Sequence, residues 1–302
     1  MGRVHPANDP GVDPVSSVLV IGATGRQGGA VAGLLLDHGH DVTVYVRSPE
    51  SPAASALATA GARIVAGDLS DAQSLAAAAA GADAVFGLSV PFGPGGRREE
   101  VAQGRHLIDA AVRADAHLVY SSVRGGDRTQ KTDIGHADSK QQIESYLRQQ
   151  QVRATVLGPV YFMENALNLG FSRLADGVLA NPLTPGKPLD QVTVRDIAAL
   201  AVHAVENPDR FAGERIDVVS DRVTGEQAAR ILSEVVGREI PYRQLPLDQV
   251  RQWAGDEIAD MFQRFEDATE FMDVEALHAR YPEVKWHSYA DWARTVDWDR
   301  LL

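Results

Sequence analysis

The first residues of this chain whose types and spacing suggest chemistry form a glycine-rich segment, GATGRQGG at 22–29. It follows an apolar run and leads directly into the apolar pattern of a helix. Glycines spaced three apart at a strand-to-helix turn let a pyrophosphate approach the backbone and meet the N–H groups at the helix start. We therefore predict a dinucleotide-binding loop, with a ligand-free glycine turn as the alternative. Its residues are Gly22, Ala23, Thr24, Gly25, Arg26, Gln27 and Gly28.

The end of the second apolar run, at 41–46, indicates which dinucleotide would bind. An acidic residue there would hold the ribose hydroxyls of NAD, but the chain has Arg47 and no carboxylate before Glu50. An arginine offers a planar set of donors to a 2′-phosphate, which a carboxylate would repel. Arg47 therefore predicts NADP(H) as the cofactor, and Arg26 within the loop is expected to assist.

A second candidate site lies on a predicted helix at 134–149. His136 and Lys140 are four residues apart on it, so they share one face. A histidine can donate a proton near neutral pH. Lys140 also lies on the same face of this helix as the apolar residues Ile143 and Leu147, at spacings of three and seven. This pattern predicts that its side chain points inward, toward a cleft. The alternatives are a capping or packing role for His136 and an extended path along the helix surface for Lys140.

Composition narrows the classes of function. The 302 residues include 29 Lys plus Arg and 41 Asp plus Glu, and this net charge of −12 disfavours sequence-independent binding to nucleic acid. Because the chain has no cysteine, any redox reaction needs a bound cofactor. The histidines show no metal-ligand spacing, so no metal site is predicted, and His38 and His40 are expected to be solvated. No apolar run is long enough to span a membrane, and we expect a cytoplasmic protein.

The order of the apolar runs predicts the fold. Short runs alternate with helical patterns between residues 17 and 158, which is typical of an α/β fold with a doubly wound parallel sheet, the Rossmann arrangement. Residues 1–16 are expected to be a disordered leader. Residues 159–302 are expected to form a smaller, mostly helical substrate-side region, some segments of which return to the sheet. The predicted strands are 17–22, 41–46, 62–67, 83–88, 117–122 and 153–158.

Local polar residues predict where several helices begin. Asp71 is expected to cap a helix over 72–80. Thr193 with Asp196, and Thr224 with Gln227, have the three-residue spacing at which two side chains cap a helix start reciprocally.

Several segments together resemble a known family: GATGRQGG at 22–29, VRSP at 46–49, AGDLSD at 66–71 and GPVYFMEN at 158–165. With the stretches that follow Thr193 and Thr224, they make most of residues 17–245 resemble the NmrA-like family of atypical short-chain dehydrogenase/reductases. The resemblance implies a Rossmann domain that binds NADP at the carboxyl ends of its strands, and a cleft closed by the second half. The family includes NADPH-dependent reductases and NADP-sensing regulators.

Matching positions in the family assign further residues. The resemblance places the 2′-phosphate at Arg47, the adenine side at Asp68 and Leu69, and the centre of the cofactor at Ser89. It places four residues beside the nicotinamide ribose and ring: Lys140, Tyr161, Phe162 and Asn165. The alternative for Asp68 is a role as a turn or capping residue.

Classical relatives use a tyrosine and a lysine four residues apart, the lysine lowering the pKa of the phenol that donates a proton. Here His136 stands at the tyrosine position, and Lys140 stands at the lysine position. Ser122, or its neighbour Ser121 one register away, stands where a serine polarises the substrate carbonyl. We expect Lys140 as the first choice of proton donor and His136 as the second.

The resemblance implies an NADPH-dependent reductase acting on a small quinone-like or conjugated carbonyl substrate. One alternative is a catalytically silent NADP(H)-binding regulator that acts through a protein partner. A sugar epimerase is a distant third, because that chemistry also depends on the missing tyrosine. The sequence leaves open whether the chain forms a homodimer.

Overall fold

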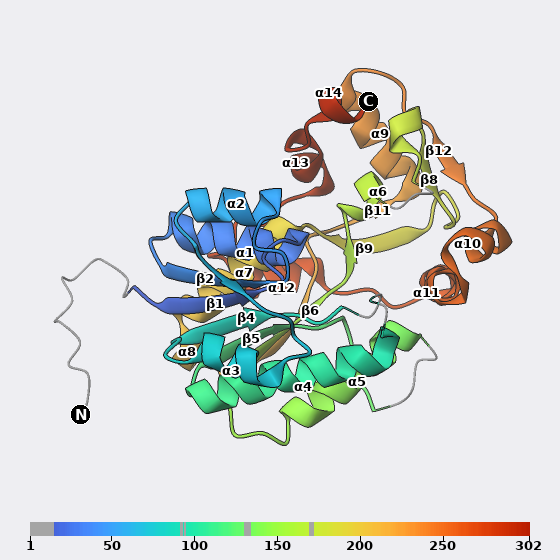
Figure 1. Cartoon of the computed structure of the whole chain (residues 1–302). Coiled ribbons are helices and arrows are strands. Elements are labelled where there is room, and N and C mark those ends of the chain that lie inside the picture. Colours follow the sequence, from blue (N-terminus) through green and yellow to red (C-terminus); the bar gives the residue numbers. More distant parts are fainter. Residues whose placement is uncertain (1–14, 91–92, 94, 130–133, 169–171) are drawn as a thin grey trace, which may run out of the picture.

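The computed structural model describes residues 15–90, 93, 95–129, 134–168 and 172–302, and at its centre lies a parallel sheet of seven strands (Figure 1). The strands follow the order β10-β6-β5-β4-β1-β2-β3, so the winding reverses between β1 and β4. This arrangement confirms the predicted doubly wound α/β fold. The strands are β1 (Ser17–Ile21), β2 (Asp41–Val46), β3 (Arg63–Ala66), β4 (Ala84–Gly87), β5 (His117–Ser121), β6 (Ala154–Pro159) and β10 (Arg215–Val218).

The predicted strands coincide with β1 to β6, with ends that differ by at most two residues. These runs are buried along nearly their whole length except in β3, as expected of parallel strands covered on both faces. β10 comes from the second half of the chain and pairs with β6 at the edge of the sheet. It is short and only alternately buried, so its sequence carries little strand signal.

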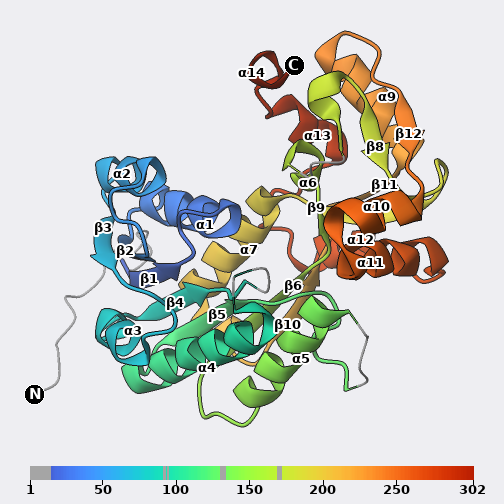
Figure 2. The same ribbon diagram turned by 45° about the vertical axis from the view of Figure 1, so that its right-hand side comes forward.

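Helices cover both faces of the sheet, and their packing makes two separate apolar cores (Figures 1 and 2). One face carries α1 (Arg26–Asp37), α2 (Pro52–Thr59) and α7 (Val194–Glu206). The other face carries α3 (Ala72–Ala79), α4 (Gly96–Ala114) and α5 (Gly135–Leu147). Both cores are built mainly of aliphatic side chains from the strands and the facing sides of the helices. Because the strands are parallel, their carboxyl ends lie along one edge of the sheet.

The predicted helix starts are confirmed at all three places. The Asp71 side chain accepts N–H groups at the start of α3, and Thr224 with Gln227 caps α9 (Gly225–Val236) reciprocally. Thr193 caps α7 as predicted, but Asp196 does not complete a reciprocal cap. The buried Asp196 carboxylate instead accepts a hydrogen bond from Ser220 Oγ at 2.5 Å.

Most of the second half lies beyond the carboxyl ends of the strands, whereas β10, α7 and α8 (Pro208–Phe211) lie with the main sheet (Figure 1). It contains a three-stranded sheet of β7 (Tyr161–Phe162), β9 (Pro188–Val192) and β11 (Asp221–Thr224), and a pair of β8 (Leu179–Asn181) and β12 (Tyr242–Gln244). Its other elements are α6 (Asn165–Asn168), a 3-10 turn (Leu174–Asp176), α8 (Pro208–Phe211), α10 (Leu247–Ala254), α11 (Asp256–Asp267), α12 (Val274–Arg280), α13 (Tyr289–Arg294) and α14 (Trp298–Leu301). Within the described residues, no helix has the length and apolar character needed to cross a bilayer.

Candidate active site

The glycine loop connects β1 to α1 at the edge where a dinucleotide would bind. Gly22 has a φ of +74°, which residues with a side chain rarely adopt. A Cβ on Gly28 would lie 2.4 Å from the carbonyl carbon and oxygen of Gly22, so the close turn requires glycine there. Among the described residues, no side chain caps the start of α1 at Gly25. The first N–H groups of α1 therefore face the loop, and this cradle fits a phosphate.

The ends of β2 and β3 bring two predicted adenine-side residues together. Arg47 directly follows β2, and Asp68 lies two residues beyond β3. The Asp68 carboxylate accepts the N–H of Ser70 at 2.8 Å, and this bond, with a smaller contribution from Arg47, holds the pKa of Asp68 below its ordinary value. The carbonyl of Leu69 is bonded to His106 Nδ1 at 2.8 Å, which fixes the turn between them.

Arg26 links the glycine loop to the second half of the chain. Its Nη1 donates to the backbone carbonyl of Glu164 at 3.3 Å. The Glu164 carboxylate in turn accepts Thr193 Oγ1 at 2.7 Å and the N–H of Val194 at 3.1 Å, at the start of α7. Burial raises the pKa of Glu164. The expected contact of Arg26 with a 2′-phosphate stays a prediction.

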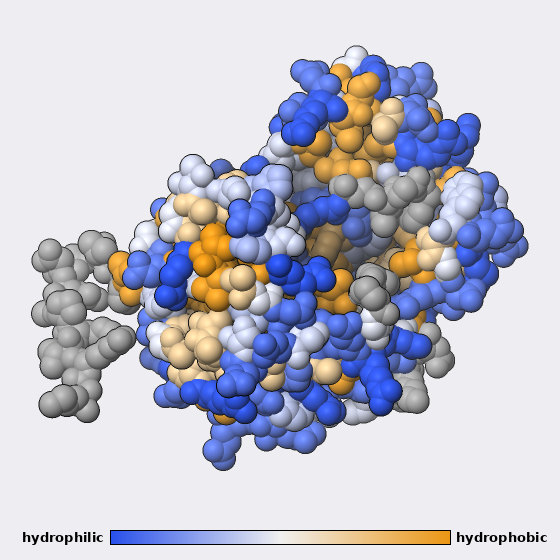
Figure 3. Space-filling view, in the orientation of Figure 1, coloured by the Kyte–Doolittle hydropathy of each residue, from blue (hydrophilic) through white to orange (hydrophobic). Residues whose placement is uncertain are grey.

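A cavity of about 740 Å³ opens at the carboxyl edge of the sheet, between the strand ends, α5 and α11. Figure 3 shows the surface hollowed between the two halves of the molecule. Arg47, Asp68 and Leu69 lie farther along the same edge, beyond β2 and β3. The predicted residues that line the cavity are Gln27, Ser89, Ser122, His136, Lys140, Tyr161, Phe162 and Asn165.

Lys140 points inward, as its stripe predicts, and lies at the floor of this cavity. Its Nζ donates to the carbonyl oxygen of Ser89 at 2.7 Å, to Ser89 Oγ at 3.1 Å and to Tyr120 Oη at 3.3 Å. It also pairs with Glu100 Oε1 at 3.1 Å. An ammonium has three N–H donors, so the neighbours within the described part of the chain engage all of them.

The charges of Lys140 and Glu100 at the cavity floor are stabilised by buried neighbours. Glu100 is fully buried, and its second oxygen accepts a short hydrogen bond from Ser139. Burial disfavours the Lys140 charge, but Tyr120 and Glu100 outweigh it and hold the pKa of Lys140 above its ordinary value. Burial also raises the pKa of the Tyr120 phenol. Lys140 and Tyr120 therefore both keep their protons at neutral pH.

His136 lies one helical turn before Lys140 and lines the cavity. Its backbone N–H donates to Glu257 Oε1 at 2.6 Å, and its Nδ1 lies 2.7 Å from the same oxygen. Glu257 belongs to α11, so this contact joins the two sides of the cavity.

The two serines at the end of β5 have different partners. Ser122 Oγ donates to Glu144 Oε1 at 2.5 Å, and Arg215 Nε donates to the other oxygen of Glu144 at 3.0 Å. Ser121 Oγ donates to Gln27 Oε1 at 2.7 Å, which connects the strand end to the glycine loop. Both serines line the cavity, and their catalytic roles stay predictions.

The sequence analysis did not identify the apolar wall of the cavity. α11 contributes Ile258, Met261 and Phe265, and the segment after it contributes Phe271. The α11 residues follow a spacing of three and seven, so helical periodicity could have marked an apolar face. That face contacts the ring of Tyr161, which Phe265 meets edge-on at 6.1 Å between ring centroids.

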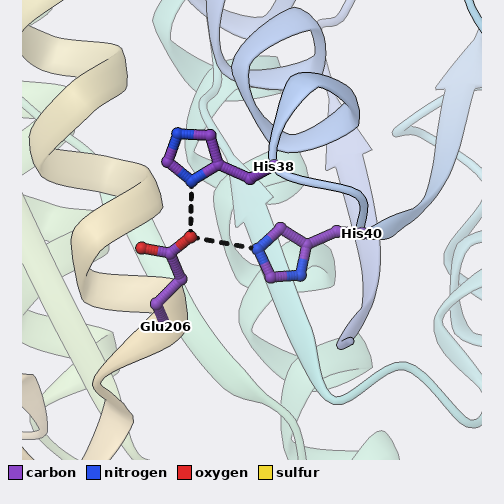
Figure 4. Close-up of side chains that lie close together, drawn as sticks. All are labelled: His38, His40 and Glu206. Atoms are coloured by element: carbon purple, nitrogen blue, oxygen red, sulfur yellow. Dashed lines mark hydrogen bonds and ion pairs between the residues drawn. The ribbon is translucent and has the colours of Figure 1, made fainter. Parts of the chain in front are cut away.

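His38 and His40 lie away from this cavity, where α1 turns into β2 at the amino edge of the sheet (Figure 4). The expectation that both are solvated is wrong for His40, which is buried. His38 Nδ1 and His40 Nε2 lie 2.7 and 3.2 Å from Glu206 Oε1, a cluster whose spacing could suit a metal ion. However, the N–H of Ser16 donates to His40 Nδ1 at 3.2 Å, which leaves the proton on Nε2. The cluster is therefore explained by hydrogen bonds to one carboxylate.

This chain has relatives of similar length among characterised proteins. It is 32% identical over 244 residues to the NAD(P)H azoreductase of Xenophilus azovorans, an alignment that covers 78% of this chain and 79% of that protein. Its fold is similar to that of NmrA, a negative transcriptional regulator, in complex with NADP, with a TM-score of 0.76, 20% identity and coverage of 95% of this chain and 97% of that one. It is equally similar to an NADPH-dependent quinone oxidoreductase from Escherichia coli complexed with NADPH, with a TM-score of 0.75, 22% identity and coverage of 91% and 98%.

The structures are too distant in sequence to show more than the fold. The family model of the NmrA-like family matches residues 14–294, which include the glycine loop, the cavity floor and α11. The chain therefore belongs to the NmrA-like family.

Proposed function

We propose that this protein is an NADPH-dependent oxidoreductase that reduces a small quinone-like or conjugated carbonyl substrate. The observation that carries the proposal is the position of Gln27. It belongs to the glycine loop, lines the cavity, and accepts the hydroxyl of Ser121 from the end of β5. A dinucleotide whose pyrophosphate lies on the loop would thus extend its reactive ring into a cavity that can enclose a second molecule.

The residues present fit a bound dinucleotide. The N–H groups at the start of α1 would hold the pyrophosphate, and Gly28 allows the close approach that a side chain would prevent. Arg47 would pair with a 2′-phosphate, which favours NADP(H) over NAD(H). The bound cofactor supplies hydride, and the protein orients it, excludes water and provides the proton.

The lining of the cavity favours a flat, conjugated acceptor. Tyr161, Phe162, Phe265 and Phe271 present aromatic rings to it. Aromatic faces and edges stack on planar conjugated molecules and exclude water from them. Burial raises the pKa of Tyr161, so its phenol stays neutral and polar at working pH. One relative is an NAD(P)H azoreductase, and an azo group, like a quinone, is a conjugated acceptor.

The test is oxidation of NADPH in the presence of a panel of quinones, enones and azo compounds. We expect steady turnover with at least one member, and a strong preference for NADPH over NADH. A protein that binds NADPH but turns over none of the panel would contradict the proposal.

A regulatory role is the second candidate, and the engagement of Lys140 favours it. If Lys140 only supports the cavity floor, it takes no part in a reaction. Binding of the cofactor could then act by changing the surface that a protein partner recognises. A partner captured only in the presence of NADP, by a protein without turnover, would support this role. Identical capture with and without NADP would remove it.

A further inference from the structure

The contact between α5 and α11 joins residues that are 121 positions apart in sequence. His136 is the second residue of α5, and Glu257 is the second residue of α11. One carboxylate oxygen of Glu257 accepts the backbone N–H of His136 at 2.6 Å and lies 2.7 Å from its ring Nδ1. Two bonds from one residue to the same oxygen fix both the backbone and the ring of His136.

These bonds determine where the ring carries its proton. A carboxylate only accepts hydrogen bonds, so Nδ1 must carry a hydrogen to bind it. The proton that such a ring can give to another molecule is then the one on Nε2. The same arrangement, a carboxylate on one imidazole nitrogen and chemistry at the other, orients the ring and stabilises its protonated form in other enzymes.

We propose that Glu257 is a positioning residue for His136, and that His136 donates the proton to the substrate from Nε2. The proposal rests on the reductase function proposed above. A bound reduced cofactor would supply a hydride to the electron-poor atom of the substrate, and the electron pair of the double bond would move to the conjugated oxygen. That oxygen would take the proton from Nε2, and the neutral ring would keep its other proton on Nδ1, hydrogen-bonded to Glu257. Solvent then returns a proton to Nε2.

The surroundings favour His136 over Lys140 for this step. The Lys140 ammonium is engaged by Ser89, Tyr120 and Glu100, so giving up its proton would leave the buried Glu100 charge unpaired. The Glu257 carboxylate is one-third exposed, and the His136 side chain is 18% exposed. A proton lost from His136 can therefore be replaced from solvent.

Glu257 also lies on the helix that forms one wall of the cavity. The same helix carries Ile258, Met261 and Phe265, which form the apolar wall. The helix that excludes water from one side of the cavity therefore also carries the carboxylate that orients His136.

The decisive variant is Glu257→Gln. Its amide oxygen can accept the same two hydrogen bonds, so the contact between the helices is kept while the negative charge is lost. We expect kcat to fall roughly ten- to a hundredfold, with the KM for NADPH and the melting temperature close to those of the unaltered protein. His136→Ala should lower kcat at least as much. The double variant should be no slower than His136→Ala, because the two residues act as one unit.

Asp256→Asn is the matched control. Asp256 is the neighbouring carboxylate on α11, is largely exposed, and pairs with Arg251 on α10. The loss of its charge at the same helix start should leave kcat unchanged. A comparable fall in Asp256→Asn would assign the effect to the helix start and overturn the proposal.

Two readouts separate this proposal from the reductase function itself. A proton resonance on His136 Nδ1 that Glu257→Ala abolishes is expected in the NMR spectrum, with or without turnover, and its absence would overturn the contact. Turnover that is normal in Glu257→Gln would overturn the positioning role and leave the reductase function standing. A protein with the resonance but no turnover of any acceptor would overturn the reductase function, and with it the proton donation.

Discussion

The Nζ of Lys140 lies 3.1 Å from Oε1 of Glu100, a carboxylate with no exposed surface. The pair joins α5 to α4 beneath the cavity, and Ser139 binds the second oxygen of Glu100. A lysine expected to act on the substrate is thus also half of a buried ion pair. Its removal affects the floor of the site as well as any chemistry.

Breaking this pair should destabilise the fold. Glu100→Gln leaves a buried ammonium without its counter-ion, and Lys140→Met leaves a buried carboxylate. We expect each to lower the free energy of unfolding by about 3–5 kcal/mol in urea titrations. The double variant should lose clearly less than the sum of the two, because neither charge is then left alone. If the stability losses of the two single variants simply add in the double variant, Lys140 and Glu100 are not energetically coupled.

Gly28→Ala should weaken cofactor binding strongly. The added Cβ would lie 2.4 Å from the backbone of Gly22, so the loop must open and lose the phosphate cradle. NADPH titration followed by fluorescence or calorimetry should show at least a tenfold weaker affinity. Gly33→Ala is the control on the same helix, since its Cβ meets nothing within 4 Å. It should bind normally and gain up to about 1 kcal/mol of stability from the better helix propensity of alanine. Normal binding by Gly28→Ala would contradict the role of the loop.

Arg47→Gln should reduce discrimination between the two nicotinamide cofactors. The loss of a charged hydrogen bond to the 2′-phosphate is expected to weaken NADPH binding roughly ten- to a hundredfold. NADH has no 2′-phosphate, and its affinity should stay the same and serve as the internal control. Glutamine is chosen because a carboxylate would also repel the neighbouring Asp68, whose pKa Arg47 helps to lower. Equal losses for both cofactors would place Arg47 elsewhere on the dinucleotide.

His117 should make the protein less stable in acid. It is the first residue of β5, its Nε2 binds Thr155 Oγ1 at 2.9 Å, and burial lowers its pKa from 6.5 to about 4. Between these values the unfolded chain binds a proton that the folded chain excludes. Stability therefore falls as the pH drops from 6.5 to 4, by up to about 3 kcal/mol, and this contribution is constant above and below that window.

The variant His117→Gln isolates this contribution. Glutamine can donate to Thr155 but does not titrate. The stability of the unaltered protein relative to His117→Gln should therefore decrease between pH 6.5 and 4. Unfolding curves at several pH values measure it. Parallel pH profiles for the two proteins would show that His117 is protonated in the folded state as readily as in the unfolded one.

Much of the fold can be predicted from the sequence alone, because it depends on local chemistry. The strand β1, the loop at 22–29 and α1 are predicted from neighbouring residues, since only glycine accepts the turn at Gly22 and the tight contact at Gly28. The inward direction of Lys140 follows from the apolar stripe that it shares with Ile143 and Leu147. The absence of an acidic residue directly after β2 can be read from the sequence without the structure.

The tertiary structure decided which partners these residues have. Glu100 at Lys140, Glu257 at His136 and Glu206 at His40 come from elements 40, 121 and 166 positions away. Asp196 has the spacing of a helix cap, yet it is buried against Ser220. Such pairings are set by how the helices pack on the sheet and by the crossovers between strands. Local propensity and spacing carry no information about them, which is why the sequence marks the proton-bearing residues and the fold determines how each can be used.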